Sequence, residues 1–500
     1  MKTLRATALT LVTLAISAIT PAAAIAQTPV PLVEVAENFE LVGHDPLMNR
    51  GMNAALAVHG DYAYVGSRTD GKPWGTDENL LNAGVMVVDV SDPAAPEVVN
   101  QIGPPHEGLQ DQTSREMRVW HSEELLIVEN LASNCSELIH ECAPVGGSPD
   151  VFTFYDISGD RGADPEFVAN YDPSVNPHEF FLWEDPFVPG RALLFISATS
   201  SDRLLVTDIS NARDGAFEEL TSWPVPVPSG DLHSMSISND GMRAYLADLT
   251  GGFLVADTSD LANGVADPQI ELVTPNANRV SWPGPGAHSA LKLWGRDVAF
   301  VADEVYGEAL ASPVFNPPHG CPWGWVRTID ISDPVAPALL GEYRLAQNEE
   351  SYCDSDPPRA TASYSAHNPT LTPDIGFITW HSGGLQAIDL DDPAAPTQAG
   401  VFSPMPEALA VTEDPALSSG PDKVVMWSFP IIQDGLLYVV DVRNGLYILR
   451  YTGEDADAVS GIAFLEGNSN LGDALAFEQP DPCDRDPVPA GYDCEATGQL

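Results

Sequence analysis

The chain has 500 residues, and 44% of them are hydrophobic, enough to bury a large core. It carries 72 acidic against 22 basic residues, a formal net charge of −50. A surface of this charge repels a phosphate backbone, so we expect no nucleic-acid partner. The acidic residues are spread along the chain, which favours a role in solubility over a dedicated cation-binding tract.

The N-terminus has the pattern of a secretory signal peptide. Residues 1–5 are short and basic, residues 6–20 are apolar, and the Ala-Ile-Ala at 24–26 fits a small-residue cleavage motif. We therefore predict a signal peptide over residues 1–26 and export to the periplasm or the cell exterior. No later stretch is long and apolar enough to predict a membrane span.

The six cysteines lie in three local groups along the chain. In an exported protein, oxidising conditions favour disulfides, and these spacings do not match a CxxC zinc site. Other connectivities are open, but local pairing is the one we predict. The predicted pairs are Cys135 with Cys142, Cys321 with Cys353, and Cys483 with Cys494.

A repeated unit runs through the chain, with a short apolar strand ending in Asp and another apolar strand before it. Such strands, rich in β-branched and aromatic residues and bounded by Gly, Asp and Pro, indicate antiparallel sheet. The repeated Asp is expected to accept backbone N–H bonds in a turn. The Asp-terminated strands are expected at 84–89, 151–156, 203–208, 252–257, 325–330 and 384–389, with 445–450 ending in Arg.

In its best copies the Asp-terminated strand continues into Ser-Asp-Pro-x-x-Pro, at 91–96 and 332–337. This motif resembles the LVIVD repeat of bacterial surface and exported proteins, and the resemblance covers most of residues 50–452. It implies a β-propeller. It implies no particular activity, because propellers host many unrelated functions.

Four strands per unit, repeated seven times, predict an all-β fold: a seven-bladed β-propeller of four-stranded antiparallel blades. We place it at 37–452, after a linker at 27–36. The strand expected at 39–43 would complete the seventh blade and close the ring. The acidic, Gly/Pro-rich tail at 453–500, with its Cys pair, is expected to be an appendage.

Four histidines share one position, the start of the first strand of four consecutive units. In a propeller this strand lines the central channel, so the four imidazoles are expected to converge at one mouth. Imidazole is the most common transition-metal ligand, which predicts a site for Fe, Cu, Zn or Mn with open positions for water, oxygen or substrate. The predicted ligands are His178, His233, His288 and His367.

Two further residues are candidates for catalysis. His381 ends a second strand and is expected to be a fifth ligand or a proton-transfer group. Arg115 is expected to hold a substrate carboxylate or sulfate, the alternative being a pair with Asp111 or Glu116. Carboxylates near the same mouth are expected to orient the ligating imidazoles: Glu129, Glu179, Asp248, Asp303, Glu304 and Asp441.

The layout is similar to that of two enzyme groups with His-ligated metals on a seven-bladed propeller axis. These are the carotenoid-cleaving oxygenases, with iron, and the selenium-binding-protein-like thiol oxidases, with copper. Neither group's motifs are present, so no substrate is carried over. We predict a metal-dependent, redox enzyme acting on a small molecule. The alternatives are a metal-free ligand pocket, an inert polar lining, and a non-catalytic secreted or cell-surface scaffold with a protein ligand.

Overall fold

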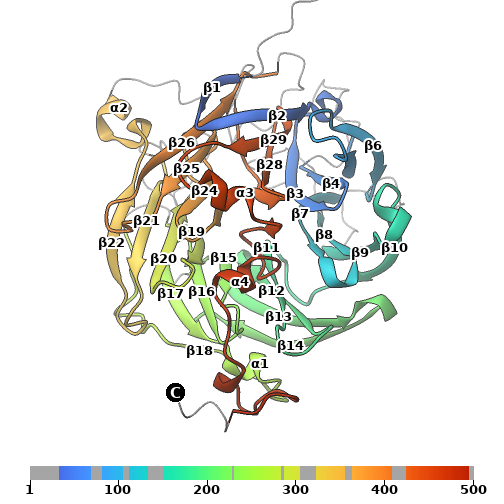
Figure 1. Cartoon of the computed structure of the whole chain (residues 1–500). Coiled ribbons are helices and arrows are strands. Elements are labelled where there is room, and N and C mark those ends of the chain that lie inside the picture. Colours follow the sequence, from blue (N-terminus) through green and yellow to red (C-terminus); the bar gives the residue numbers. More distant parts are fainter. Residues whose placement is uncertain are drawn as a thin grey trace, which may run out of the picture.

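The computed structural model describes residues 33–68, 82–104, 112–132, 150–227, 230–282, 286–304, 323–354, 363–407 and 424–494. Antiparallel β-sheets are arranged around a common centre in a β-propeller-like fold (Figure 1). The predicted all-β class is confirmed. The described helices are short: α1 (Ser259–Ala262), α2 (Glu350–Asp354), α3 (Ala456–Ser460) and α4 (Ala474–Phe477).

Strands that follow one another in the chain pair with one another in space. The first sheet holds β3 (Asn53–His59), β4 (Tyr62–Ser67), β5 (Val85–Asp89), β6 (Glu97–Ile102), β7 (Gln112–Trp120), β8 (Leu125–Ala132), β9 (Val151–Asp156) and β10 (Glu166–Tyr171). The second holds β11 (Glu179–Glu184), β12 (Ala192–Ala198), β13 (Arg203–Asn211) and β14 (Ala216–Pro224).

The next two sheets repeat this four-strand pattern. They contain β15 (Leu232–Ile237), β16 (Arg243–Asp248), β17 (Gly252–Asp257) and β18 (Glu271–Leu272), then β19 (Ala287–Lys292), β20 (Val298–Asp303), β21 (Val326–Asp330) and β22 (Ala338–Tyr343).

The last two sheets take strands from both ends of the chain. One joins β1 (Val33–Glu37) to β23 (Pro369–Leu371), β24 (Ile375–Thr379), β25 (Leu385–Asp389) and β26 (Thr397–Pro404). The other joins β2 (Phe39–Asp45) to β27 (Ile431–Gln433), β28 (Leu436–Asp441), β29 (Gly445–Tyr451) and β30 (Phe464–Leu465).

Neighbouring sheets pack face to face through alternate residues of each strand. On β12, Leu194 and Ile196 belong to the core shared with Phe152 of β9. Leu193 and Phe195 of the same strand face the next core, with Leu246 of β16 and its neighbours. Because successive side chains of a strand point to opposite faces, each strand contributes to two cores.

The repeated Asp has the predicted turn role. The carboxylates of Asp89, Asp330 and Asp389 each accept a hydrogen bond at 2.9 Å from the backbone N–H two residues further on. This confirms a structural function for the repeat's Asp and separates it from the chemistry of the site.

Strand pairing of the N-terminal segment begins at an earlier residue than predicted. β2 pairs with β29, from Phe39 opposite Tyr451 to Asp45 opposite Leu446. The predicted linker at 27–36 is wrong in its last part, because β1 begins at Val33 and pairs with β26. Strand β26 would otherwise present an unpaired edge, and alternating Val and Glu residues suit an edge strand.

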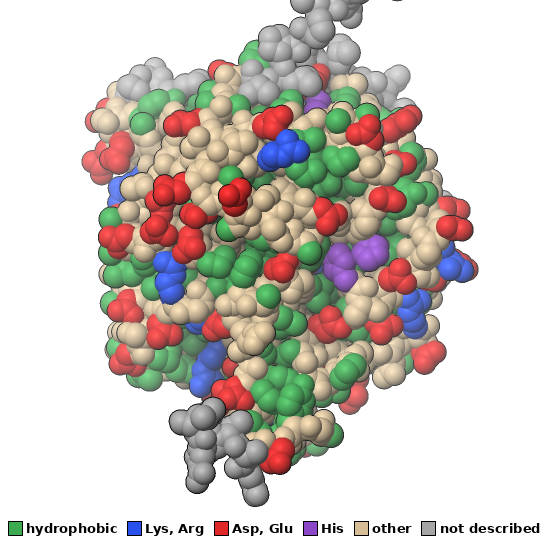
Figure 2. Space-filling model, in the orientation of Figure 1, with side chains coloured by type: hydrophobic (Ala, Val, Ile, Leu, Met, Phe, Trp, Pro, Cys, Tyr) green, Lys and Arg blue, Asp and Glu red, His purple; other side chains and the backbone are tan. Residues whose placement is uncertain are grey.

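Acidic side chains are spread over the face seen in Figure 2, with few basic ones between them. No helix in the described part of the chain is long and apolar enough to cross a membrane. Cys483 and Cys494 form the predicted disulfide. Cys353 is also disulfide-bonded, while Cys321, Cys135 and Cys142 lie outside the described residues.

The C-terminal tail is not an appendage. β30 pairs with β27, and the chain after it enters the centre of the sheets, where the Asn468 amide donates to the Phe180 carbonyl at 2.8 Å. Gly467 permits this insertion, because a Cβ there would overlap the carbonyl oxygen of Pro369. The prediction of an appendage failed because hydrogen bonds between residues far apart in the chain hold the tail, and no local sequence pattern predicts such bonds.

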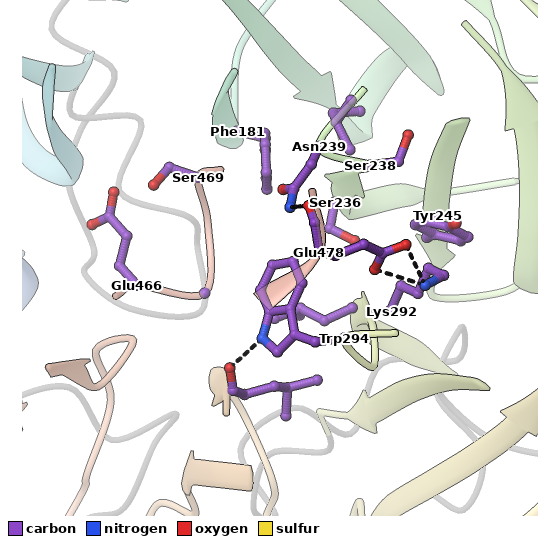
Figure 3. Close-up of a pocket in the computed structure, with 14 residues that line it drawn as sticks. Phe181, Ser236, Ser238, Asn239, Tyr245, Lys292, Trp294, Glu466, Ser469 and Glu478 are labelled. Atoms are coloured by element: carbon purple, nitrogen blue, oxygen red, sulfur yellow. Dashed lines mark hydrogen bonds and ion pairs between the residues drawn. The ribbon is translucent and has the colours of Figure 1, made fainter. Parts of the chain in front are cut away.

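Figure 3 shows how the tail is held beyond this point. The Asn239 amide donates to the carbonyls of Ala474 and Glu478, both at 2.8 Å. The Lys292 ammonium contacts both carboxylate oxygens of Glu478, at 2.9 and 2.8 Å. These side chains line a pocket of about 30 Å³, room for one or two waters.

Asn239→Ala should detach this part of the tail. Two carbonyls lose their donor in a buried position, which should lower the free energy of unfolding by about 1–3 kcal/mol. Hydrogen exchange should show lost protection of the amides at 474–478. Asn278→Ala, which removes an exposed amide bond to the Val335 carbonyl, is the matched control. Unchanged protection in Asn239→Ala would contradict the assigned anchor.

Candidate metal centre

The four repeated histidines lie at equivalent places in their sheets. His178 directly precedes β11, His233 and His288 are the second residues of β15 and β19, and His367 lies two residues before β23. Their rings form a row, with centroid separations of 4.4, 3.9 and 4.4 Å from His178 to His367. Strand starts that are far apart in the chain are thus brought together at one end of the axis.

Glu304, directly after β20, is the centre of this cluster. One of its oxygens, Oε2, lies 3.2 Å from His288 Nε2. The other, Oε1, lies 3.1 Å from His367 Nε2 and 3.3 Å from His381 Nε2. Glu304 is 4% exposed, and the three imidazoles around it are 0–2% exposed. A single buried carboxylate therefore faces three imidazole nitrogens.

The other ring nitrogen of each of these histidines has its own partner. His367 Nδ1 lies 2.7 Å from the Trp427 carbonyl oxygen. His288 Nδ1 lies 2.7 Å from Ser289 Oγ, and His381 Nδ1 lies 3.3 Å from Ser363 Oγ. Metal-ligating histidines use their second nitrogen in this way, which fixes the ring and directs the first nitrogen at the ion.

The bond to Trp427 identifies a place for a cation. A carbonyl oxygen only accepts, so His367 Nδ1 must carry a hydrogen and donate it. In the neutral ring, Nε2 then has a lone pair aimed at Glu304 Oε1, 3.1 Å away. Two electron-rich atoms in this position need a positive charge between them. Either a proton shared by the two atoms or a metal ion can provide it.

Several neighbouring pairs of atoms in the cluster lie at distances that suit ligands of a metal ion. Metal–N and metal–O bonds of about 2.0–2.2 Å put neighbouring ligand atoms about 2.8–3.5 Å apart. The contacts of Glu304 fall in this range, and so does the 2.8 Å between His178 Nε2 and His233 Nε2. Glu179 Oε1 is further away, at 3.8 Å from His233 Nδ1 and 3.9 Å from His288 Nε2.

Two overlapping groups of potential ligand atoms result in the described part of the chain. Glu179, His233 and His288 form one, and His288, Glu304 and His367 form the other. His178 joins the first group through His233, and His381 joins the second through Glu304. The structure thus interleaves two carboxylates with the four predicted imidazoles, and His288 is common to both groups.

The two carboxylates have opposite electrostatic environments. Burial and the nearby Glu116 raise the pKa of Glu179 well above its usual value. Burial also opposes ionisation of Glu304, but His367 and His288 outweigh it and hold the pKa of Glu304 well below its usual value. The surroundings of Glu304 therefore favour its ionised form, whereas those of Glu179 favour its neutral form.

Burial favours the neutral form of several imidazoles, which is the form that binds a metal. It lowers the pKa of His178 to about 3, with a further contribution from Arg115. It lowers the pKa of His381 to about 4, against the opposing effect of Glu304. The pKa of His233 is also well below its usual value, because of burial and the neighbouring His288.

His381 has a strained backbone beside the cluster. Its φ angle is +29°, a region that residues other than Gly rarely adopt. Its ring lies parallel to that of Trp427, 5.2 Å between centroids and 9° between planes. Trp427 also packs on His367, 4.0 Å between centroids. Strain of this kind persists only where the surroundings hold it, and it concentrates at functional sites.

Arg115 lies on β7 near the same end of the axis. It is partly buried, and its positive charge contributes to the low pKa of His178. Glu116, the alternative partner, pairs with Arg118 at 3.3 Å, and the charge of Arg115 also acts on the pKa of Glu116. Asp111, the other alternative, lies outside the described residues. The structure therefore places Arg115 within electrostatic range of the row of histidines.

Most of the other carboxylates expected to orient histidines have structural roles instead. Asp248 accepts backbone N–H bonds from Asp231 and Thr250, both at 3.0 Å. Asp441 accepts them from Val425 and Arg443, at 2.7 and 2.8 Å. Asp303 pairs with Arg327. They end strands, where a carboxylate readily caps a turn, so their expected role toward the imidazoles is wrong.

The floor beneath the cluster comes from β7 and the tail. Arg118 is 1% exposed and lies between the rings of Phe180 and Phe429, 5.3 and 5.1 Å from their centroids. Its Nε donates to the Asn468 carbonyl at 3.3 Å. Glu466, 4% exposed, lies close enough for Arg118 to act on its pKa. Sequence reasoning missed this layer, since only the polar run at 468–470 marked it.

Glu129 is a buried acid opposite Glu116 on the adjacent strand. It is 0% exposed, and neither of its oxygens has a hydrogen-bond partner among the described residues. Burial and the charges of Glu116 and Asp150 raise its pKa well above the usual value. Its neutral form is therefore the one that the fold accommodates.

Glu129→Gln should stabilise the protein in a pH-dependent manner. Because its pKa is raised in the folded state, the contribution of Glu129 to the free energy of unfolding is present below about pH 4.5 and is lost as the pH rises. The variant should match the parent near pH 4 and exceed its free energy of unfolding by about 1–3 kcal/mol at pH 8. Thermal unfolding at both pH values measures this. Exposed Glu271→Gln is the control, and an equal effect at both pH values would contradict a neutral Glu129.

Comparison with known proteins identifies the repeat. Residues 50–71, 81–102 and 327–344 match the LVIVD repeat. The chain therefore carries LVIVD repeats, as its motif predicted. None of the curated proteins matches the chain.

Several solved structures resemble the chain at low identity. Sqt1 from Chaetomium thermophilum is 13% identical over 82% of this chain and 86% of that one, with a TM-score of 0.44. A chain of a mitotic checkpoint complex is 8% identical over 88% and 98%, also with 0.44. A hypothetical selenium-binding protein from Sulfolobus tokodaii is 13% identical over 57% and 64%, with 0.39. Likeness at this level carries no conclusion about function.

Proposed function

We propose that the chain is an exported β-propeller scaffold that binds a transition metal ion at the His/Glu cluster. The observation that carries this proposal is the arrangement of His367, whose Nδ1 donates to a carbonyl while its Nε2 faces Glu304 at 3.1 Å. A metal ion between them uses the lone pair and the carboxylate together.

The donor set favours a borderline transition metal. Up to five imidazoles and one ionised carboxylate are the ligands of Fe, Cu, Zn or Mn sites, whereas Ca²⁺ and Mg²⁺ take oxygen ligands. His288 and His367, with Glu304 between them, form the best-defined part of the set, since their second nitrogens are already held. The row from His233 to His178 would complete the coordination.

The proposal also includes a closed ring of seven blades and export of the protein. The pairing of β2 with β29 supports a ring closed by an N-terminal strand, and the four-strand units support seven blades. The pattern at 1–26 supports export. An exported scaffold with LVIVD repeats is also suited to binding a protein ligand on its surface, and that role would remain if no metal were bound.

Metal analysis of the protein, purified without a His-tag, tests the site. We expect about one ion per chain and its loss, with affinity weakened more than ~10-fold, in His367→Ala and Glu304→Gln. Free metal at about 100 times its Kd should also stabilise the parent by about 2.7 kcal/mol. Plasma-ionisation mass spectrometry and thermal unfolding provide the two readouts.

His44→Ala is the matched control for the metal measurement. This imidazole is partly buried and bonds the Asn444 carbonyl at 2.7 Å, but it belongs to neither ligand group. It should leave the metal content unchanged. Absence of bound metal after reconstitution with each of Fe, Cu, Zn and Mn would overturn the proposal. A proton would then lie between Glu304 and His367 instead of a metal ion, and a protein-binding scaffold would remain.

A second candidate function is oxidation of a small molecule at the bound metal, with dioxygen as the oxidant. The strained His381, with φ +29° and its Nε2 3.3 Å from Glu304, favours it. A histidine so placed can transfer protons at the metal without being needed to hold it. Arg115 would then help to position the substrate.

His381→Asn tests the second candidate, since Asn tolerates a positive φ better than most residues. Metal-loaded parent protein should consume oxygen with at least one member of a panel of small thiols and phenols. The variant should retain its metal and lose ~100-fold or more in rate. Loss of metal from the variant would make His381 a ligand instead. No turnover with any panel member would leave metal binding without oxidation.

A further inference from the structure

Two histidines, His59 and His121, contact each other away from the His/Glu cluster. His59 is the last residue of β3, and His121 directly follows β7. These two strands are neighbours in the fold (Figure 1). The four repeated histidines of the cluster lie at or before the starts of their strands instead. Since the inner strands run in one direction along the axis, the pair and the cluster lie at opposite ends of it.

The two imidazoles face each other through the same ring atom. His59 Nδ1 lies 2.9 Å from His121 Nδ1, with 4.9 Å between the ring centroids. In a neutral pair at this distance, one of the two nitrogens must carry a hydrogen and the other a lone pair. The alternative is a cation that both lone pairs bind. A separation of about 2.8–3.5 Å is what neighbouring ligands of one transition-metal ion have.

Glu124 supports His59 from the other side of its ring. Its Oε1 lies 4.0 Å from His59 Nε2. A carboxylate beside the outer nitrogen of an imidazole favours the hydrogen there, which leaves a lone pair on the inner nitrogen. Glu124 also has a φ angle of +49°, a conformation that residues other than Gly rarely adopt. The side chain of a strained residue thus faces the outer nitrogen of His59.

The tail of the chain fixes the ring of His121. Phe464 of β30 packs on this imidazole, with 4.1 Å between the ring centroids. The outer nitrogen of His121, Nε2, is buried and has no hydrogen-bond partner among the described residues. No contact of Nε2 therefore requires that the hydrogen of His121 be on Nδ1, and the Nδ1 lone pair is able to face His59.

The surroundings favour the form of both rings that binds a metal. Burial lowers the pKa of His59, against the opposing charge of Glu124. Burial, with a further contribution from His59, lowers the pKa of His121 to about 3. The His59 side chain is still 25% exposed and that of Glu124 47%, so an ion from solution can reach the pair. The net charge of −50 attracts cations to the surface.

We propose that His59 and His121 bind a divalent transition-metal ion through their Nδ1 atoms, with Glu124 orienting His59. Imidazole suits Cu²⁺, Ni²⁺ and Zn²⁺, and water completes the coordination on the exposed side. With two protein ligands, this site binds an ion more weakly than the cluster and fills when metal is added to the purified protein. It is a second site, and it does not depend on the function proposed for the cluster.

Equilibrium dialysis against Cu²⁺ tests the pair. The parent protein should bind one more Cu²⁺ than His59→Gln or His121→Phe, since each variant removes one of the two ligands and should weaken this binding by ~10-fold or more. His121→Phe keeps an aromatic ring against Phe464. Glu124→Gln should weaken the same binding by ~10-fold, because it removes the charge that orients His59. Thermal unfolding of each metal-free variant shows whether it is folded.

Controls separate this site from the cluster. His44→Ala removes a partly buried histidine that bonds a backbone carbonyl and should bind as much Cu²⁺ as the parent. Glu304→Gln, which impairs the cluster at the other end of the axis, should retain the Cu²⁺ ion of the pair. Failure of the cluster to bind metal would therefore leave this result unchanged, and failure of the pair would leave the metal of the cluster in place.

Electron paramagnetic resonance of Cu²⁺ in Glu304→Gln provides a second readout. The signal should show coupling to two imidazole nitrogens, and it should be lost in the double variants with His59→Gln or with His121→Phe. Equal Cu²⁺ binding by the parent and both histidine variants would overturn the proposal and leave a hydrogen bond between two neutral rings. Loss of the ion in one of the two variants alone would overturn it as well, because a single histidine would then hold the metal.

Discussion

The inner strands of the sheets start at one end of a common axis, and the candidate site depends on this constraint. His178, His233 and His288 are spaced by 55 residues, yet their rings lie 4.4 and 3.9 Å apart. His233 and His288 each lie at a register shift of a paired strand, and His178 directly precedes one. Paired strands and their bulges therefore set the positions of the imidazoles, which is what a preorganised site requires.

Burial then decides the charge states within the cluster. Removing ionisable groups from water favours their neutral forms, and this applies to Glu179 and to the histidines other than His367. Glu304 is the exception, because His367 and His288 face its two oxygens and favour its ionised form. An ionised carboxylate that faces an imidazole lone pair requires a cation between the two. The bond from His367 to the Trp427 carbonyl creates this arrangement, since it turns the lone pair toward the carboxylate.

The repeat made the strands and the row of histidines predictable. The Asp-terminated strands expected at 151–156 and 252–257 coincide with β9 and β17, because their hydrophobic pattern reflects local pairing. Glu304 was grouped with other acids that end second strands, and only three-dimensional proximity separates it from Asp303, which pairs with Arg327. Arg68 carried no pattern at all, since its position follows from one bridge between two sheets.

The position of the C-terminal tail could not be predicted for a related reason. Asn468 and Phe180 are bonded across 288 positions of the chain, a contact for which sequence periodicity holds no information. The inserted tail bonds Arg118 through the Asn468 carbonyl, so a ligand that entered past Arg118 would have to displace a buried polar contact. Arg68, Arg115 and Trp427 lie around the cluster itself. Two arginines and an indole therefore border the cluster, although the protein as a whole is strongly acidic.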